Sequence, residues 1–244
     1  MTARVRSLSL GFAILRLLAS SGAQSLTEVA RALQLNPSSC LNLLRTLVDE
    51  GAVDFEGRRK TYRLADDWAA TDVFGTGKAQ TLIERMQPLM THAAKNASAT
   101  IGLWQVVPGQ RVRLIAHAEC DAMLRIQLAE GQRQPLGSGA IGRALAAAQG
   151  LDDGEIARRF AEVKWQKVVR LRDYIAEVRI AQTCGYAVDD GAAFAGVCSV
   201  AVALPHLTPS FCLSASLFSG SRSADEVKNI GLALLDIKRA IMES

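Results

Sequence analysis

The spacing of apolar residues between positions 25 and 64 predicts two short helices followed by a hairpin. The second helix lies between Pro37 and Gly51. Pro37 suits a first helical turn because its missing N–H would have no partner there, and Gly51 suits a left-handed C-cap. The apolar residues of this helix recur at i, i+4, i+7 and i+8, so they predict one buried stripe. They are Cys40, Leu44, Leu47 and Val48.

The segments on either side complete a winged helix-turn-helix. Thr27 is the predicted N-cap of the preceding helix, whose apolar spacing ends at Leu33. Residues 34–36 leave room only for a tight turn between the two helices. A strand, a turn and a return strand are then predicted at residues 52–55, 56–60 and 61–64.

The remaining surface of the second helix carries short polar groups, an amide and a guanidinium that can read DNA. They are Ser38, Ser39, Asn42, Arg45 and Thr46. In a major groove, Asn pairs with adenine and Arg with guanine, whereas hydroxyls bind phosphates. Leu41 is also predicted to point outward, where it would meet a thymine methyl. The alternative is an ordinary amphipathic helix with a solvated polar face.

Charge supports a DNA-binding function for this part of the chain. Arg58, Arg59 and Lys60 occupy the predicted hairpin turn, where they suit a phosphate backbone. The alternative is a solvated turn. Residues 1–65 hold 9 Lys and Arg against 5 Asp and Glu, whereas the remainder holds 19 of each. The net charge of +4 therefore lies in the N-terminal quarter, as expected for a DNA-binding surface.

A first helix is predicted at residues 7–20, ending at Gly22, with apolar residues on more than one side. Such a helix can serve both its own core and a partner subunit, which a dimeric repressor requires. The alternative is simply a well-buried helix.

The composition changes at residues 65–76, and a helix at 78–96, kinked at Pro88, would connect two domains. The expected parts are residues 1–66, 67–97 and 98–244.

The C-terminal part is predicted to be a mixture of strands and helices. Strands are expected at residues 100–107, 111–117, 123–128, 197–204 and 211–218, helices at 153–162, 171–184 and 224–242, and a turn at 185–191. The loop at 131–142 is rich in small residues and leads into a helix at Arg143. A loop that enters a helix N-terminus suits a carboxylate, although a plain connector is the alternative.

Composition excludes several classes of protein. With 244 residues and 49% hydrophobic content, the chain can bury a sizeable core and is expected to form two domains. No run approaches the roughly 20 apolar residues of a membrane span, and the N-terminus lacks a secretory signal, so cytoplasmic residence is expected. The five cysteines form no Cys-x-x-Cys pair and are expected to be reduced and mostly buried. His92, His117 and His206 show no ligand spacing, so neither a metal nor a cofactor is predicted.

Four segments, taken together in their order and spacing, resemble the isocitrate lyase regulator (IclR) family of bacterial transcription factors along nearly the full chain. They are Leu26-Thr-Glu-Val-Ala-Arg-Ala-Leu with Pro37-Ser-Ser and Leu43-Leu-Arg-Thr-Leu, then Lys60-Thr-Tyr-Arg-Leu, then Pro135-Leu-Gly-Ser-Gly-Ala-Ile-Gly-Arg-Ala-Leu, and finally Gly185-Tyr-Ala-Val-Asp-Asp-Gly with Gly196-Val. The resemblance implies an α+β fold: an N-terminal winged helix-turn-helix, a linker helix, and a GAF-like effector-binding domain with an antiparallel sheet flanked by helices. It also implies homodimers or dimers of dimers on pseudo-palindromic operators in double-stranded DNA, and a small-molecule effector such as an organic or aromatic acid.

The resemblance further implies which residues bind the effector. They are Met123, Ile126, Gly139, Ala140, Ile141, Asp189, Ser199, Leu217 and Ser219. A carboxylate would lie against the N–H groups of residues 139–141, with Asp189 accepting a hydrogen bond from the ligand and both serines donating. The alternative is that these residues only fill the domain core.

The chain departs from the family pattern at several positions. Asn42 stands where Arg is usual, which predicts a different operator, and Gly137 stands where His is common. Ile141 and Leu217 make the implied pocket smaller or more apolar, which favours an aromatic or branched acid over a two-carbon acid.

Two rival functions remain. An enzyme would need a constellation such as His206, Asp189 and a serine, but no Gly-x-Ser-x-Gly elbow, phosphate loop or metal motif accompanies them, so no enzymatic activity is predicted. The other rival is a winged-helix DNA-binding protein whose C-terminal domain serves only dimerisation. The sequence identifies neither the effector nor the operator, nor whether the protein activates or represses.

Overall fold

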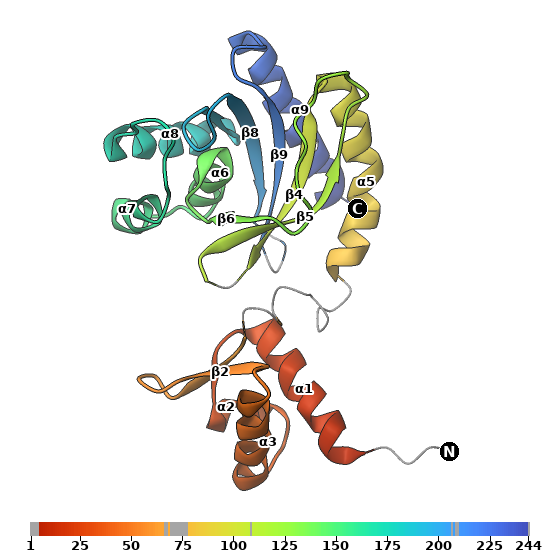
Figure 1. Cartoon of the computed structure of the whole chain (residues 1–244), viewed down its shortest axis with the longest axis vertical. Coiled ribbons are helices and arrows are strands. Elements are labelled where there is room, and N and C mark those ends of the chain that lie inside the picture. The colour runs from red at the N-terminus through yellow and green to blue at the C-terminus, as the bar shows by residue number, and fades with distance from the viewer. Residues whose placement is uncertain are drawn as a thin grey trace. The chain divides into compact units, whose positions relative to one another are not determined.

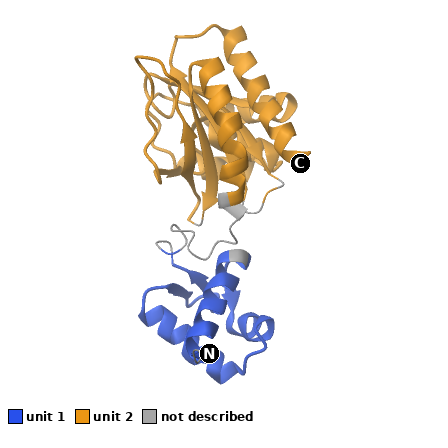
Figure 2. Cartoon of the chain, turned by 90° about the vertical axis from the view of Figure 1, so that its right-hand side faces the viewer, with its two compact units in different colours: residues 1–79 blue, residues 80–244 orange. Residues whose placement is uncertain are grey.

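A computed structural model describes residues 5–65, 68, 78–107, 109–205, 207 and 210–243. The chain divides into two compact units, residues 1–79 and 80–244 (Figure 2). The composition change at residues 65–76 falls almost entirely outside the described residues, as does His206. Among the described helices, none is both long enough and apolar enough to cross a membrane.

In residues 5–65, unit 1 contains three helices and a small antiparallel sheet (Figure 1). The elements are α1 (Arg6–Ser21), β1 (Gln24–Ser25), α2 (Leu26–Ala32), α3 (Pro37–Asp49), β2 (Val53–Glu56) and β3 (Thr61–Leu64). The sheet order is β1-β3-β2, so the predicted hairpin is confirmed and gains a short third strand. The predicted winged helix-turn-helix is therefore the fold of this unit.

Helix caps explain where α2 and α3 begin. The N-cap of α2 is Ser25 rather than the predicted Thr27, because Ser25 and Glu28 form a reciprocal capping box. The backbone N–H of Ser25 donates to the Glu28 carboxylate at 2.7 Å, which lowers the pKa of that carboxylate. Asn36 caps α3 by accepting from the N–H of Ser38 at 2.9 Å, and Pro37 takes the first helical position as predicted.

The core of unit 1 contains the predicted stripe of α3. Cys40 and Leu44 are fully buried, and Leu47 and Val48 pack half-buried against the same cluster. Residues from all three helices and from the sheet complete the cluster, among them Ile14, Val29, Tyr62 and Leu64. Burial of this stripe holds α3 in place and leaves its polar face on the surface.

Unit 2 is a six-stranded antiparallel sheet with helices on both faces (Figure 1). The elements are α5 (Lys78–Ala97), β4 (Thr100–Val107), β5 (Arg111–Ala118), β6 (Arg133–Pro135), α6 (Gly139–Ala148), α7 (Asp153–Ala161), α8 (Leu171–Cys184), β7 (Ala187–Asp190), β8 (Val197–Leu204), β9 (Phe211–Phe218) and α9 (Ala224–Met242). The strand order is β6-β5-β4-β9-β8-β7. Helices α6, α7 and α8 cover one face, and α5 and α9 lie on the other (Figures 1 and 2).

Two predictions in unit 2 are wrong. Residues 123–128 form no strand, because β6 pairs with β5 at residues 111–113 and β4 takes the other edge of β5. Residues 187–190, predicted as part of a turn, form strand β7 and pair with β8. Two adjacent aspartates disfavour a strand locally. Here a buried ion pair of Asp189 offsets that preference.

The cysteines match the prediction. All five are free, with Cys40, Cys120, Cys198 and Cys212 buried and Cys184 half-buried. Burial raises the pKa of the Cys198 thiol to about 11, so this thiol stays protonated at neutral pH. These residues behave as small apolar groups rather than as nucleophiles.

Candidate functional sites

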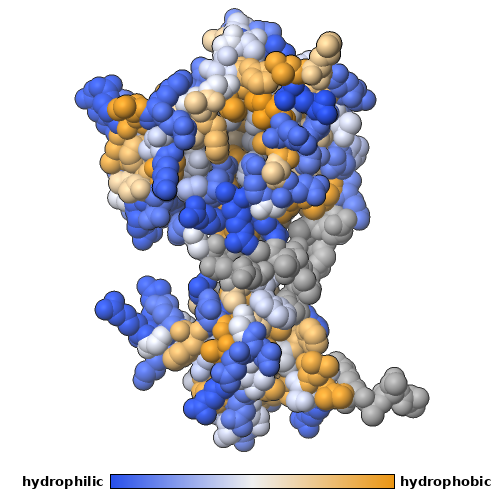
Figure 3. All heavy atoms as spheres, in the orientation of Figure 1, coloured by the Kyte–Doolittle hydropathy of each residue, from blue (hydrophilic) through white to orange (hydrophobic). Residues whose placement is uncertain are grey.

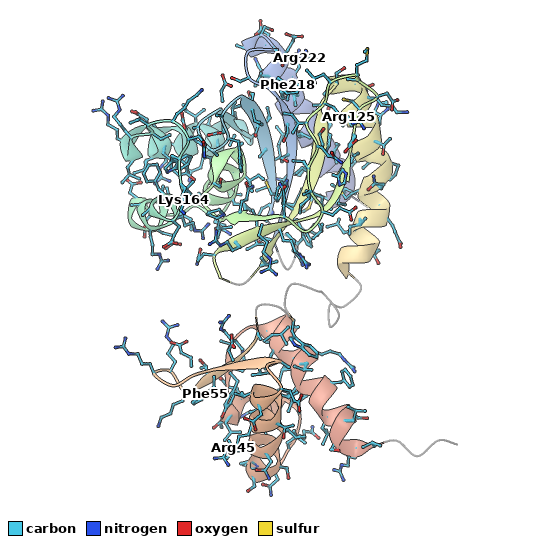
Figure 4. All side chains as sticks on the ribbon, viewed as in Figure 1. Arg45, Phe55, Arg125, Lys164, Phe218 and Arg222 are labelled. Carbon is cyan, nitrogen blue, oxygen red and sulfur yellow. The ribbon has the colours of Figure 1, made fainter. Side chains whose placement is uncertain are left out.

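The exposed face of α3 presents the residues that the sequence predicted. Ser38, Ser39, Asn42, Arg45 and Thr46 are all exposed, and Arg45 projects from the helix (Figure 4). Among the described residues, no carboxylate forms an ion pair with the Arg45 guanidinium, so its donors remain available. These groups form a continuous polar face of the kind that enters a major groove.

Two residues of α3 differ from expectation. Leu41 is half-buried rather than fully outward, so it offers only part of its side chain to a partner. The Thr46 hydroxyl donates to the backbone carbonyl of Asn42 at 3.0 Å. The single hydroxyl proton of Thr46 is therefore already used within the helix.

The turn between β2 and β3 forms a hydrophilic projection (Figure 3), and three of its residues are cationic. The side chains of Arg58, Arg59 and Lys60 are exposed. Arg59 pairs with Glu56 at 3.8 Å, but both are exposed, so the pair holds the guanidinium only weakly. At the base of the turn, Phe55 is 47% exposed and its ring lies 4.7 Å from that of Tyr62. The hairpin therefore presents positive charge at its turn, and the contact between the two aromatic rings stabilises the strands below it.

Helix α1 has two apolar faces. Ile14, Leu15 and Leu18 lie in the core of unit 1, whereas Leu8 and Phe12 are 60% and 38% exposed. The exposed pair lies one helical turn apart, on one stripe of the helix. Burying one face and exposing another is the pattern predicted for a helix that contacts both its own core and a partner.

Unit 2 contains a cavity of about 190 Å³ on the sheet face that α6 covers. Of the residues that the sequence predicted, five line this cavity: Ile126, Gly139, Ala140, Ile141 and Ser199. The sheet contributes Trp104, Ser214 and Ser216 as well, and the loop before β8 contributes Phe194. The strand period of two could have found the serines, since Ser214 and Ser216 share one face of β9.

Four predicted effector residues do not line this cavity. Met123 is fully exposed on the coil after β5. Leu217 follows Ser216 along β9 and so points to the opposite face of the sheet. Ser219 lies beyond the end of β9 and donates its hydroxyl to Asp190 at 2.5 Å.

Asp189 is the fourth. It lies opposite Ser199 in the ladder, beside the cavity, but its carboxylate is fully engaged. One oxygen accepts from Arg143 at 2.8 Å and the other from the backbone N–H of Ala193 at 3.0 Å. Asp189 therefore supports the wall of the cavity, and both of its carboxylate oxygens already accept hydrogen bonds.

The N-terminus of α6 opens into the cavity. The first intrahelical bond runs from the N–H of Gly142 to the carbonyl of Ser138 at 2.8 Å, so the three preceding N–H groups have no intrahelical partner. The N-cap Ser138 makes no capping bond with its side chain. Gly139 has φ +57°, and a Cβ there would lie 3.3 Å from the side chain of Ala193. Both the left-handed backbone and the close packing against Ala193 favour glycine at this position. The helix begins at Gly139, earlier than the predicted start near Arg143.

The electrostatics of the cavity favour an anion. None of the side chains that line it is charged, so only the unpaired N–H groups and the positive pole of α6 offer charge to a ligand. The hydroxyls of Ser199 and Ser216 have no hydrogen-bond partner among the described residues. Apolar walls with a few converging polar groups are typical of a small-molecule site. Within the described residues, no cluster of His, Cys, Asp and Glu could hold a metal.

A polar network that is buried at Arg143 and Tyr174 and exposed at Glu177 lies behind this site. Arg143 donates to Glu177 at 2.6 Å and lies 4.6 Å from the centroid of the Tyr174 ring. Tyr174 in turn donates to the carbonyl of Gly137 at 2.8 Å. Burial raises the pKa of Tyr174 to about 12, so the phenol remains a donor at neutral pH. These bonds hold the loop that leads into α6.

Two family models match the chain. The one described as "Bacterial transcriptional regulator IclR C-terminal" covers residues 76–242, and the one described as "IclR helix-turn-helix domain" covers residues 7–57. The HTH-type transcriptional regulator BhcR of Paracoccus denitrificans is 27% identical over 196 residues, which span 76% of this chain and 67% of that protein.

Solved structures share the fold over nearly the whole chain. The IclR-type regulator from Alicyclobacillus acidocaldarius has a TM-score of 0.60 at 23% identity, with 98% of both chains covered. The IclR protein of Thermotoga maritima has a TM-score of 0.57 at 18% identity, with 97% of this chain and 99% of that chain covered. An IclR homologue from Microbacterium hydrocarbonoxydans, complexed with 4-hydroxybenzoate, has a TM-score of 0.56 at 17% identity, with 96% and 99% covered.

Proposed function

The chain belongs to the IclR family of bacterial transcriptional regulators, and from that premise we propose that a small organic acid in the cavity of unit 2 controls its affinity for an operator. Members of the family are DNA-binding regulators with an effector domain, not enzymes. The observation that carries the proposal is the unpaired N-terminus of α6, which opens into an otherwise uncharged cavity.

The ligand is a single-ring acid. An apolar cavity of about 150 Å³ holds one benzene molecule, so about 190 Å³ accommodates one ring with one or two polar substituents. Its carboxylate would accept from the N–H groups of residues 139–141, and Ser199 and Ser216 would bind a hydroxyl or the second carboxylate oxygen. The 4-hydroxybenzoate complex of the Microbacterium homologue supports an aromatic acid of this size.

Unit 1 would bind the operator through α3 and the β2–β3 turn. Asn42 and Arg45 would contact base edges in the major groove, while Arg58 and Lys60 neutralise phosphates. Two copies joined partly through α1 would recognise the two halves of a pseudo-palindrome, as a homodimer or a dimer of dimers. A regulator of chromosomal DNA acts in the bacterial cytoplasm, where we expect this protein.

Control follows if the ligand favours one arrangement of the two DNA-binding units in the dimer. Half-site spacing on DNA is fixed by the double helix, so a change in that arrangement changes operator affinity. A useful switch needs a coupling free energy of about 1–3 kcal/mol between the two sites.

Calorimetry with 4-hydroxybenzoate tests the proposal on the full chain. Ser216→Ala should weaken binding by about 1 kcal/mol or more, because a ligand group loses its buried hydrogen bond. Ser219→Ala is the matched control, since Ser219 lies outside the cavity and bonds Asp190, so its affinity should equal that of the parent. Equal affinity of parent and Ser216→Ala would place the ligand elsewhere.

A domain used only for dimerisation is the rival function, and a thermal-shift screen separates the two. A true effector stabilises the folded state by mass action, by about 2.7 kcal/mol at 100 times its Kd. If no member of a panel of aromatic and branched acids raised the Tm, the cavity would not be a sensor.

A further inference from the structure

Trp104 forms part of the cavity wall from the middle of the sheet. It lies on β4, is only 3% exposed, and belongs to the core cluster between the sheet and α6. Its indole N–H donates to the hydroxyl of Ser214 on β9 at 2.8 Å. Since this bond uses the single polar group of the indole, a ligand meets only the carbon surface of the ring.

The position of the indole depends on Gly102. This glycine lies two residues before Trp104 on the same face of β4, and Ser214 is its partner in the ladder with β9. A Cβ on Gly102 would lie 2.8 Å from the indole nitrogen and 3.0 Å from a methyl of Leu128. The indole therefore folds back along the sheet over the space that the missing side chain leaves.

We propose that Trp104, held down on the sheet by Gly102 and Ser214, is the specificity-determining platform of the cavity and selects flat aromatic acids over saturated acids of equal size. This inference rests on the proposed function, because it concerns the ligand of the same site. The platform is fixed from two sides, by a hydrogen bond and by close packing, so it cannot adjust to a puckered ring.

The polar groups of the cavity do not distinguish such ligands. The N–H groups at the start of α6, the hydroxyls of the lining serines and the amides of the three lining glutamines can bind carboxylate and hydroxyl groups on either kind of ring. Discrimination must come from the ring itself. An aromatic ring that stacks offset or edge-on against an indole gains affinity beyond its buried area, by about two- to tenfold.

The test compares 4-hydroxybenzoate with 4-hydroxycyclohexanecarboxylate by calorimetry on the full chain. The parent should bind the aromatic acid at least about threefold more tightly. Trp104→Leu should bind the two acids with nearly equal affinity, whereas Trp104→Phe, which keeps an aromatic ring, should retain part of the preference for the aromatic acid. Trp165→Phe is the control, because Trp165 does not line the cavity. The ratio of its affinities for the two acids should equal that of the parent.

Gly102→Ala provides a second, independent variant, since it keeps Trp104 but displaces the indole. Gly102→Ala should lower the ratio of the affinities for the aromatic and the saturated acid, while its far-UV circular dichroism remains that of the parent. If Trp104→Leu fails to fold, this variant alone tests the proposal. A Trp68→Phe/Trp165→Phe chain retains Trp104 as its single tryptophan. Its fluorescence should change when 4-hydroxybenzoate is added and saturate with the calorimetric Kd.

The possible failures are distinguishable. If the parent binds neither acid, the proposed function fails. If the parent binds 4-hydroxybenzoate but Trp104→Leu and Gly102→Ala keep the parental ratio, the function stands and the platform is refuted.

Discussion

Arg143 donates to Asp189 at 2.8 Å, and both side chains are almost fully buried, with 3% and 2% of their surfaces exposed. The pair joins the helix whose N-terminus opens into the cavity to edge strand β7. Through Ala193, Asp189 also holds the loop that carries Phe194 to the cavity wall. A buried ion pair thus fixes two sides of the ligand site relative to each other.

We predict that Asp189→Ala lowers the free energy of unfolding of unit 2 by about 3–5 kcal/mol, because it removes the buried carboxylate partner of the buried Arg143 guanidinium and leaves only the exposed Glu177. Urea denaturation followed by tryptophan fluorescence measures this change. Asp236→Ala is the control, since it breaks the exposed pair with Arg239 and should cost about 1 kcal/mol or less. Equal losses in the two variants would contradict a structural role for the Arg143–Asp189 pair.

For DNA binding, we predict that Asn42→Ala changes operator preference, with a cost of about 1–3 kcal/mol at the base it contacts. Arg58→Ala should instead weaken all sequences alike and reduce the salt slope by about one unit. Gel-shift titrations at several salt concentrations distinguish the two patterns. An Asn42→Ala protein with unchanged affinity and preference would show that α3 does not read bases at this position.

For assembly, we predict that Leu8→Glu shifts the protein toward monomer, because it introduces a charge into the exposed apolar stripe of α1. Sedimentation at micromolar concentration measures the shift. Arg31→Glu also changes charge on the exposed surface of unit 1, but on α2, and should leave the oligomer intact. A Leu8→Glu protein that assembles like the parent would exclude this face as an interface.

Tyr174 gives a pH dependence that a single variant can isolate. Because burial raises its pKa from 10 to about 12, the neutral phenol stabilises the fold below pH 10, and this contribution is lost as the pH rises toward 12. Tyr174→Phe should lose about 1–2 kcal/mol at neutral pH, since the carbonyl of Gly137 loses its donor. The difference between parent and variant should then shrink above pH 10 in parallel denaturation series, and a constant difference would contradict the assignment.

Regular periodicity made most elements predictable. The stripe of α3, the alternation of the β2–β3 hairpin and the long amphipathic α9 each repeat a pattern over a few turns or strand steps, and the structure confirms them. The start of α2 moved to Ser25 because two side chains three residues apart cap each other, which the sequence also contains.

Long-range pairing explains the failures. Residues 123–128 have strand-like composition but find no free edge, whereas residues 187–190 have poor strand composition but find the edge of β8. Leu217 and Ser219, which the family resemblance implied, do not line the cavity for a related reason. A shift along a strand moves a side chain to the other face or beyond the sheet, while Ser214 and Ser216 face the cavity.

The sequence by itself determined the winged helix-turn-helix, the location of the positive charge, the family, and a helix that follows the small-residue loop, because each is encoded in neighbouring residues. Only the tertiary structure decided which side chains share the cavity. In the folded chain, Asp189 forms an ion pair with Arg143, and Trp104, Ser214 and Phe194 line the cavity. These residues are far apart in the chain, so their proximity depends on sheet order and register, which no local pattern encodes.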